Sequence, residues 1–250
     1  MRPSRLTALL LLAPFCLLLA TAAAAQETPV ICFGDSITAG VGATAETRWE
    51  AVLQRLGAGR VRTINEGVSG RTLADAVSPR EGGKFSNGRQ EPLPPDGSPT
   101  LAQDVVTRHP EAEFVVVLLG VNDLKNNRAD GVDKSALALR NAATLIEQVR
   151  AVRPRLRVVL CCPANINPEA VNEVNRAKRY DAQTHAWVKS LSVKLRGLAK
   201  SKRVAYCDLS TVVSPANYTD GLHPNERGHE QIARAVWAVL RRELGGRRKR

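Results

Sequence analysis

Short apolar segments of strand length alternate along this chain with longer segments of helical period, and this alternation most constrains the fold. The third apolar segment, Phe114–Leu119, is apolar at every position. A strand that is apolar on both faces is buried on both faces, as in a parallel sheet covered by helices on each side. The predicted strands are Pro29–Phe33, Val61–Asn65, Phe114–Leu119, Leu156–Cys162 and Arg203–Leu209.

The segments between these strands place apolar residues on one helical face. In the segment 133–152, for example, Ala138, Ala142 and Leu145 fall on one side at spacings of four and three residues. Alternating strands and helices predict a single three-layer α/β/α domain with right-handed crossovers. The predicted helices are Trp49–Leu56, a helix that starts at Ser98 and Pro99 and ends near Arg108, Asp133–Val152, Asn172–Leu198 and Asn225–Leu244.

The first residues have the composition of a secretory signal. Arg2 and Arg5 precede an apolar run over 8–20, and small residues then lead to Ala25. We expect cleavage after Ala25 and export, to the periplasm or the medium of a bacterium. A retained membrane anchor is the alternative, but the run is short for a span and Pro14 interrupts it. The predicted organisation is a signal peptide at 1–25, one domain at 26–244 and a basic, disordered tail at 245–250.

The charge of the chain narrows the range of partners. Lys and Arg outnumber Asp and Glu by 36 to 24, a formal net charge of +12, and residues 247–250 are all basic. Such a tail can make weak contacts with anionic surfaces. Aromatic residues make up only 4% of the chain, which disfavours a base-stacking surface, so no nucleic-acid partner is expected.

The cysteines and one irregular segment have no predicted role in catalysis. The cysteines after residue 25 lie in or at the ends of apolar segments without metal-ligand spacing, so we expect buried, unreactive thiols. The segment Ser78–Ser98 is rich in Gly, Pro and charged residues, and is predicted to be an irregular excursion at the rim of the domain. The cysteines concerned are Cys32, Cys161, Cys162 and Cys207.

A serine follows the first predicted strand directly, in Gly34-Asp35-Ser36. Open α/β sheets bind their ligands at the carboxyl ends of strands, and Gly34 permits a tight turn there. Taken alone, the motif is equally consistent with a turn or a helix cap formed by Asp35 or Ser36. A catalytic interpretation therefore depends on a base elsewhere in the chain.

A histidine near the C-terminal end can supply that base. Serine is a weak nucleophile and the pKa of histidine lies near neutrality, so His223 suits the role of general base for Ser36. Asp220, with Gly221 following it, can fold back to the ring, set its tautomer and stabilise the imidazolium. Structural or surface roles are expected for the other histidines, His109, His185 and His229.

Acyl transfer also needs hydrogen-bond donors for the oxyanion. Gly70 follows the second strand, and its backbone N–H can approach a ligand closely because glycine has no side chain. Asn122 follows the third strand, and its side-chain amide can donate. The first three strands are therefore each followed by a group suited to acyl transfer.

Four segments together resemble the conserved blocks of the SGNH (GDSL-type) hydrolases, and the resemblance spans about residues 29–244. It implies a flavodoxin-like parallel sheet of five strands in the order 2-1-3-4-5, with no metal and no cofactor. It implies a catalytic triad of Ser36, His223 and Asp220, and an oxyanion hole formed by Ser36, Gly70 and Asn122. The four segments are Gly34-Asp35-Ser36, Gly67-Val68-Ser69-Gly70, Gly120-Val121-Asn122-Asp123 and Asp220-Gly221-Leu222-His223. Ile37, where the family name implies Leu, is a conservative departure.

The predicted activity is hydrolysis of carboxylic esters through an acyl-enzyme on Ser36. The chain is similar to the bacterial carbohydrate O-acetylesterases of this family, which implies short acyl groups on a polar or carbohydrate alcohol. The expected partner is therefore a small-molecule or carbohydrate ester. A lysophospholipase- or thioesterase-like enzyme that acts on longer acyl chains is the alternative.

Three other interpretations remain open. Ser69 is a rival nucleophile, although Arg71 replaces the second glycine of a Gly-x-Ser-x-Gly elbow. A non-catalytic module could bind polyanions or a surface through the basic tail. The least favoured interpretation is a metal hydrolase built on Asp35, Asp123, Asp220 and His223.

Overall fold

The computed structural model describes residues 27–79, 100–126 and 131–246. The predicted signal peptide at 1–25, most of the irregular segment 78–98 and the basic residues 247–250 lie outside these ranges. Within them, no helix combines the length and the apolar character that a membrane span requires.

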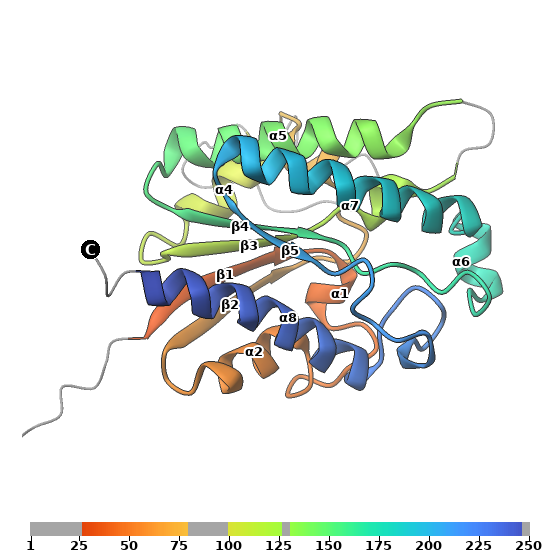
Figure 1. Cartoon of the computed structure of the whole chain (residues 1–250), viewed down its shortest axis with the longest axis horizontal. Helices are drawn as coiled ribbons and strands as arrows, with labels where there is room; N and C mark the ends of the chain where they lie inside the picture. The colour runs from red at the N-terminus through yellow and green to blue at the C-terminus, as the bar shows by residue number, and fades with distance from the viewer. Residues whose placement is uncertain (1–26, 80–99, 127–130, 247–250) are drawn as a thin grey trace, which may run out of the picture.

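Five parallel strands form one sheet in the order β2-β1-β3-β4-β5, which confirms the predicted α/β fold and its strand order (Figure 1). The register aligns the carboxyl ends of three strands, because Gly34 pairs with Gly67 on one side and with Leu118 on the other. The strands are β1 Thr28–Gly34, β2 Val61–Gly67, β3 Phe114–Leu118, β4 Arg157–Cys162 and β5 Ala205–Asp208.

Helices follow the strands and cover both faces of the sheet. Figure 1 shows α5 and α7 above the sheet and α2 and α8 below it. The α-helices are α1 Ser36–Ala39, α2 Trp49–Gly57, α3 Leu73–Val77, α4 Leu101–Thr107, α5 Lys134–Val152, α6 Glu173–Ala177, α7 Ala182–Lys202 and α8 Glu226–Gly245, and the 3-10 helices are η1 Val121–Leu124 and η2 Pro215–Asn217.

Side chains of the strands alternate between two hydrophobic cores, one on each face of the sheet. Ile31, Val115 and Val117 pack against α3, α4, α5 and α7. Val30 and Val116 point the other way, into the core formed with α2 and α8. Every side chain of β3 is buried, and burying such a side chain contributes roughly 1.5–3 kcal/mol. The uniformly apolar third strand is therefore the centre of the sheet.

The predicted helix Asn172–Leu198 is wrong as a single element. The structure divides it into α6 and α7, with Arg179 in the left-handed region at φ 70° between them. Asp181 starts α7 as an N-cap, because its carboxylate accepts hydrogen bonds from the N–H groups of Gln183 and Thr184. The break turns Tyr180 inward, where it is 2% exposed.

Two helix starts also differ from the prediction. Thr100, rather than Ser98, is the N-cap of α4, and its hydroxyl accepts from the N–H of Gln103. Asn225, rather than Pro224, precedes the first residue of α8, and its side chain accepts from the N–H of Gly228. In both cases the side chain of the observed N-cap satisfies a free N–H of the first turn.

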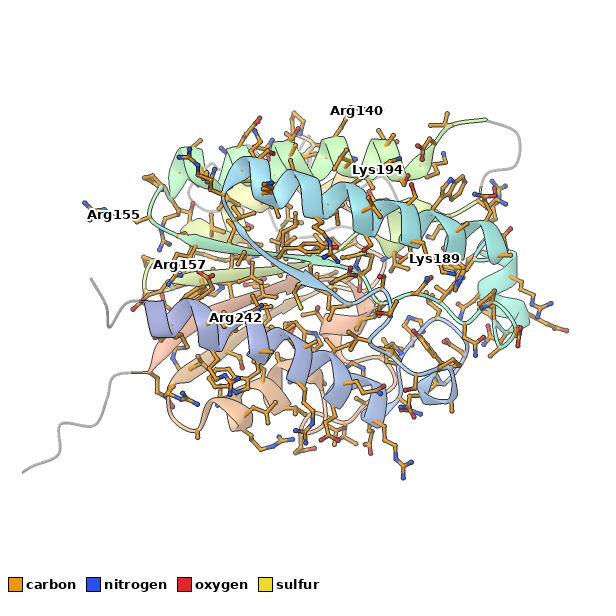
Figure 2. All side chains as sticks on the ribbon, viewed as in Figure 1. Arg140, Arg155, Arg157, Lys189, Lys194 and Arg242 are labelled. Carbon is orange, nitrogen blue, oxygen red and sulfur yellow. The ribbon has the colours of Figure 1, made fainter. Side chains whose placement is uncertain are left out.

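The cysteines within the described residues are buried free thiols, as predicted. Many of the cations, by contrast, lie on outer surfaces: Figure 2 shows Arg140, Lys189 and Arg242 on exposed faces of α5, α7 and α8. Part of the positive charge of the chain is thus spread over the outer faces of the helical layers.

Candidate active site

Ser36 is the first residue of α1, immediately after β1. The Asp35 carboxylate caps this helix by accepting a hydrogen bond from the N–H of Ile37 at 3.0 Å. A Cβ atom at Gly34 would lie 2.0 Å from Oγ1 of Thr38, so only glycine allows so close a turn between strand and helix. This turn holds Ser36 at the carboxyl edge of the sheet with 8% of its surface exposed.

The structure brings Ser36, His223 and Asp220 together. Oγ of Ser36 lies 3.0 Å from Nε2 of His223, and Nδ1 of the same ring lies 2.8 Å from Oδ2 of Asp220. Oδ1 of Asp220 accepts from the backbone N–H groups of Leu222 and His223. Partial burial raises the pKa of Asp220, but the hydrogen bonds from the backbone and ring of His223 outweigh it and leave the pKa below its ordinary value. The carboxylate therefore stays ionised beside the ring.

The loop that carries His223 rests on the segment after β4. Gly221 has φ 79°, and a Cβ atom there would lie 2.3 Å from the backbone nitrogen of Val171. The carbonyl of Gly221 accepts from the N–H of Asn167, and that of Asp220 accepts from the N–H of Asn172. Glycine is therefore required for the loop to lie this close to its neighbour.

Asn122 lies in η1, directly after β3, and all of its side-chain hydrogen-bonding groups are engaged. Nδ2 donates to the carbonyl of Arg71 at 2.9 Å and to Oδ2 of Asp35 at 3.3 Å. Oδ1 accepts from the hydroxyl of Tyr180 at 2.5 Å. Because the tyrosine hydroxyl donates to the oxygen, it determines which way the amide is turned. Tyr180 carries no recognisable sequence signal, since it depends on the break between α6 and α7.

Two buried carboxylates connect the strand ends. Burial raises the pKa of Asp35 to about 7, against the hydrogen bond from Ile37 and the charge of Arg71. Burial also raises the pKa of Asp123 to about 7. Asp123 accepts from the N–H groups of Leu73 and Ala74 at 2.8 and 3.1 Å, so it fixes the start of α3 to η1. These hydrogen bonds give Asp123, in the segment Gly120-Val121-Asn122-Asp123, a structural role that the sequence did not predict.

Arg71 is buried behind the site, with 2% of its surface exposed. Its guanidinium donates to the carbonyls of Gly34 and Glu66, and it lies over the ring of Phe33 at 5.0 Å. These contacts connect the ends of β1 and β2, while the Arg71 carbonyl accepts from Asn122. In the sequence, Arg71 stands out only as a departure from the Gly-x-Ser-x-Gly motif.

Ser36 and His223 of the predicted triad and the predicted oxyanion residues line one cavity of about 410 Å³, and Asp220 lies behind the ring of His223. Gly70 lines it with φ 83°, a conformation that favours glycine. Ser69 also lines it, but Nε2 of His223 is hydrogen-bonded to Ser36. The lining residues are Ser36, Val41, Ser69, Gly70, Asn122, Lys125, Asn175, Lys178, Tyr180, Leu222 and His223.

The other histidines make structural contacts. The ring of His229 is buried between the N–H of Trp49 and the carbonyl of Val41, and burial lowers its pKa. His185 contacts the carbonyl of Ile166 at 3.1 Å, and His109 lies 2.6 Å from Glu66. None of the three lines the cavity.

The residues considered for a metal hydrolase do not form a ligand set. Across 27–79, 100–126 and 131–246, no group of three or more His, Cys, Asp or Glu side chains is placed to hold a metal ion. Asp123 is bonded to backbone N–H groups of α3, and Asp220 to His223. The structure thus offers no basis for a metal-centred site at these residues.

Comparison with known proteins places the chain among the carboxylic ester hydrolases. The model of the GDSL-like lipase/acylhydrolase family matches residues 32–231, so the chain belongs to this family. This confirms the resemblance to SGNH hydrolases seen in the sequence.

Solved structures share the fold. A carbohydrate acetylesterase family member from Sinorhizobium meliloti is 22% identical with a TM-score of 0.66, and the match covers 88% of this chain and 100% of that chain. The native aryl esterase of M. smegmatis is 21% identical with a TM-score of 0.65, covering 86% of this chain and 99% of that one. No curated protein matches the chain.

Proposed function

We propose that this protein hydrolyses carboxylic esters through a covalent acyl-enzyme on Ser36. His223 takes the proton of the Ser36 hydroxyl as the oxygen attacks the ester carbonyl, and then gives it to the leaving alcohol. Asp220 holds the ring in the tautomer that accepts at Nε2 and stabilises the imidazolium. Water then attacks the acyl-enzyme in the same way and releases the acid. The 3.0 Å contact between Ser36 Oγ and His223 Nε2 is the observation that carries this proposal.

The oxyanion is stabilised by the backbone N–H groups of Ser36 and Gly70 and by the side-chain amide of Asn122. The first turn of a helix has no internal acceptor for its N–H groups, which favours the N–H of Ser36 as a donor. Asn122 donates to Asp35 at 3.3 Å, longer than its 2.9 Å bond to Arg71. The longer bond is the one that an oxyanion displaces or shares.

The proposed substrate carries a short acyl group, such as acetyl, on a polar or carbohydrate alcohol. The cavity lining supports this, because Val41 and Leu222 are the only aliphatic side chains among the lining residues in the described ranges and most of the others are polar. The name of the Sinorhizobium meliloti relative and that of the aryl esterase point to acetyl and aryl esters respectively. Long acyl chains need a more extended apolar surface than these two residues provide.

The nucleophile is tested by Ser36→Ala with p-nitrophenyl acetate. We expect turnover to fall to the background rate while the unfolding transition stays that of the wild type. Ser69→Ala is the matched control, because it removes a second hydroxyl from the same cavity and should leave most of the turnover intact. Unchanged turnover in Ser36→Ala would refute the proposed mechanism.

The acyl preference is tested with p-nitrophenyl acetate and p-nitrophenyl octanoate. We expect kcat/KM to be higher for acetate. A strong preference for octanoate would instead favour the lysophospholipase- or thioesterase-like alternative.

We further propose that the protein is exported, on the basis of the positive start, apolar run and small residues before Gln26. N-terminal sequencing of the mature protein is expected to show that it begins at Gln26. Recovery of the chain with its first residues intact in the membrane fraction would show an anchor instead.

A further inference from the structure

Two lysines line the cavity beside the triad, and no Asp or Glu is among the lining residues that the structure describes. Lys125 follows η1 and Lys178 follows α6. The N–H of Asn126 donates to the carbonyl of Arg179 at 2.8 Å, and this bond holds the two lysine-bearing segments next to each other. The fold therefore places the two lysines close enough for the charge of Lys178 to act on Lys125.

Neither lysine forms an ion pair within the described ranges. The ammonium group of Lys125 lies over the ring of Tyr180, 5.5 Å from its centroid. The hydroxyl of the same tyrosine donates to Asn122. By contrast, Lys194 and Lys202 on α7 each contact a carboxylate. The lysines of the cavity thus differ from these two lysines of the helical surface.

The local electrostatics are unfavourable for two cations. Partial burial lowers the pKa of Lys125, and the charge of Lys178 lowers it further, although Asp123 and Asp75 oppose the shift. Asp123 forms no ion pair with Lys125 within the described residues, and its oxygens accept from backbone N–H groups of α3. An anion bound between the lysines would offset both the cost of burying the charge of Lys125 and its repulsion by Lys178.

We propose that Lys125 and Lys178 bind an anionic group of the ester substrate, so that the enzyme prefers esters carrying a carboxylate or phosphate near the bond it cleaves. This inference rests on the proposed function, because it assumes that the ester is bound at Ser36. An acylated sugar acid is one such substrate. The anion can belong to the alcohol or to the acyl part, and the probes below separate these two cases.

The test compares each anionic ester with a neutral partner of similar shape. In the first pair, 4-acetoxybenzoate carries the charge on the leaving alcohol, and methyl 4-acetoxybenzoate is its neutral partner. In the second pair, mono-p-nitrophenyl succinate carries the charge on the acyl part, and p-nitrophenyl butyrate is its neutral partner. The measured quantity is the ratio of kcat/KM for the anionic ester to that for the neutral one, in low salt. We expect this ratio in the wild type to be higher for one pair than for the other. The pair with the higher ratio shows whether the anion that reaches the lysines belongs to the alcohol or to the acyl part.

The variants are Lys125→Gln, Lys178→Gln and the double exchange. We expect the ratio to fall by about threefold in each single variant and by about tenfold in the double variant, since charge-assisted contacts of this kind are worth about a factor of ten together. Turnover of the neutral esters should change little, which also shows that the variants are folded. Lys125→Arg, which keeps the charge, should retain most of the preference.

Lys200→Gln is the matched control. Lys200 is exposed in the last turn of α7, just before the chain enters β5 and thus at the amino end of the sheet. Added salt should reduce the wild-type ratio and leave that of the double variant unchanged. An equal ratio in the wild type and the double variant, for both pairs, would overturn the lysine proposal alone. Turnover that survives Ser36→Ala would instead overturn the proposed function.

Discussion

The nucleophile and its proposed base are held in place by different parts of the fold. Ser36 is attached to the sheet itself, through the turn at Gly34 and a buried polar network that includes Asp35, Asn122 and Arg71. The loop of His223 lies outside the sheet and is held by backbone hydrogen bonds to another loop. The first arrangement depends on buried side chains, whereas the second depends on backbone shape.

This difference predicts how each half of the site fails. Removing a side chain from the network around Ser36 should impair the chemistry and also disturb buried hydrogen bonds. Altering the backbone of the His223 loop should displace the base while the core of the domain stays folded. The following changes test that division, in order of decreasing effect.

Asp220→Asn should have the largest effect, lowering kcat by about 10⁴-fold as in other serine triads, because the amide no longer selects the ring tautomer that accepts from Ser36. Steady-state kinetics with p-nitrophenyl acetate measure this. The free energy of unfolding at neutral pH should change by less than about 1 kcal/mol. A loss of kcat below tenfold would show that the base does not depend on this carboxylate.

Asn122→Ala should lower kcat by about 10²–10³-fold, the usual value for loss of one oxyanion donor. It also removes the acceptor of the Tyr180 hydroxyl and one donor to the carbonyl of Arg71, so stability should fall by about 1–3 kcal/mol. The control is Asn126→Ala, which removes an amide from the next loop without reaching the cavity. Equal losses of kcat in the two variants would contradict a role for Asn122 in the chemistry.

Gly221→Ala should destabilise the His223 loop, since the added methyl group would collide with the backbone of Val171. We expect the free energy of unfolding to fall by about 1–3 kcal/mol, with a lower kcat, as measured by denaturant titration and kinetics. Gly197→Ala is the control, because nothing lies within 4 Å of its Cβ position on α7 and a helical alanine should be neutral or stabilising. Wild-type stability and kcat in Gly221→Ala would mean that the loop tolerates displacement.

Tyr180→Phe should lower kcat by about threefold to tenfold and leave KM nearly unchanged, because the amide of Asn122 loses the bond that orients it. A role in packing alone would lower stability without changing kcat. Tyr206→Phe removes a hydroxyl bonded to the carbonyl of Ser192, away from the cavity, and should leave kcat unchanged.

The smallest expected effect is the pH dependence that Asp220 adds to stability. Its pKa is lowered in the folded protein, so its contribution is present above the ordinary aspartate pKa of about 4 and is lost as the pH falls below that value. The difference in unfolding free energy between the wild type and Asp220→Asn should therefore shrink below about pH 4. A difference that grows on acidification would show that the pKa is raised instead.

The sequence by itself determined the layered fold and the candidate residues of the site. Uniform burial of Phe114–Leu118 and the alternation of strands with amphipathic helices follow from local patterns, because burial on both faces requires apolar residues throughout. Ser36, Gly70, Asn122, Asp220 and His223 were identified because each lies next to a strand end or in a short motif. In the structure Ser36, Gly70, Asn122 and His223 line one cavity, and Asp220 contacts the ring of His223.

Only the tertiary structure decided the contacts that span distant segments. The hydroxyl of Tyr180 against Asn122 and the two lysines that line the cavity depend on how separate loops pack together. Neither the spacing of residues nor their propensities encode such contacts locally, because the partners are joined through the folded core and not through the neighbouring chain.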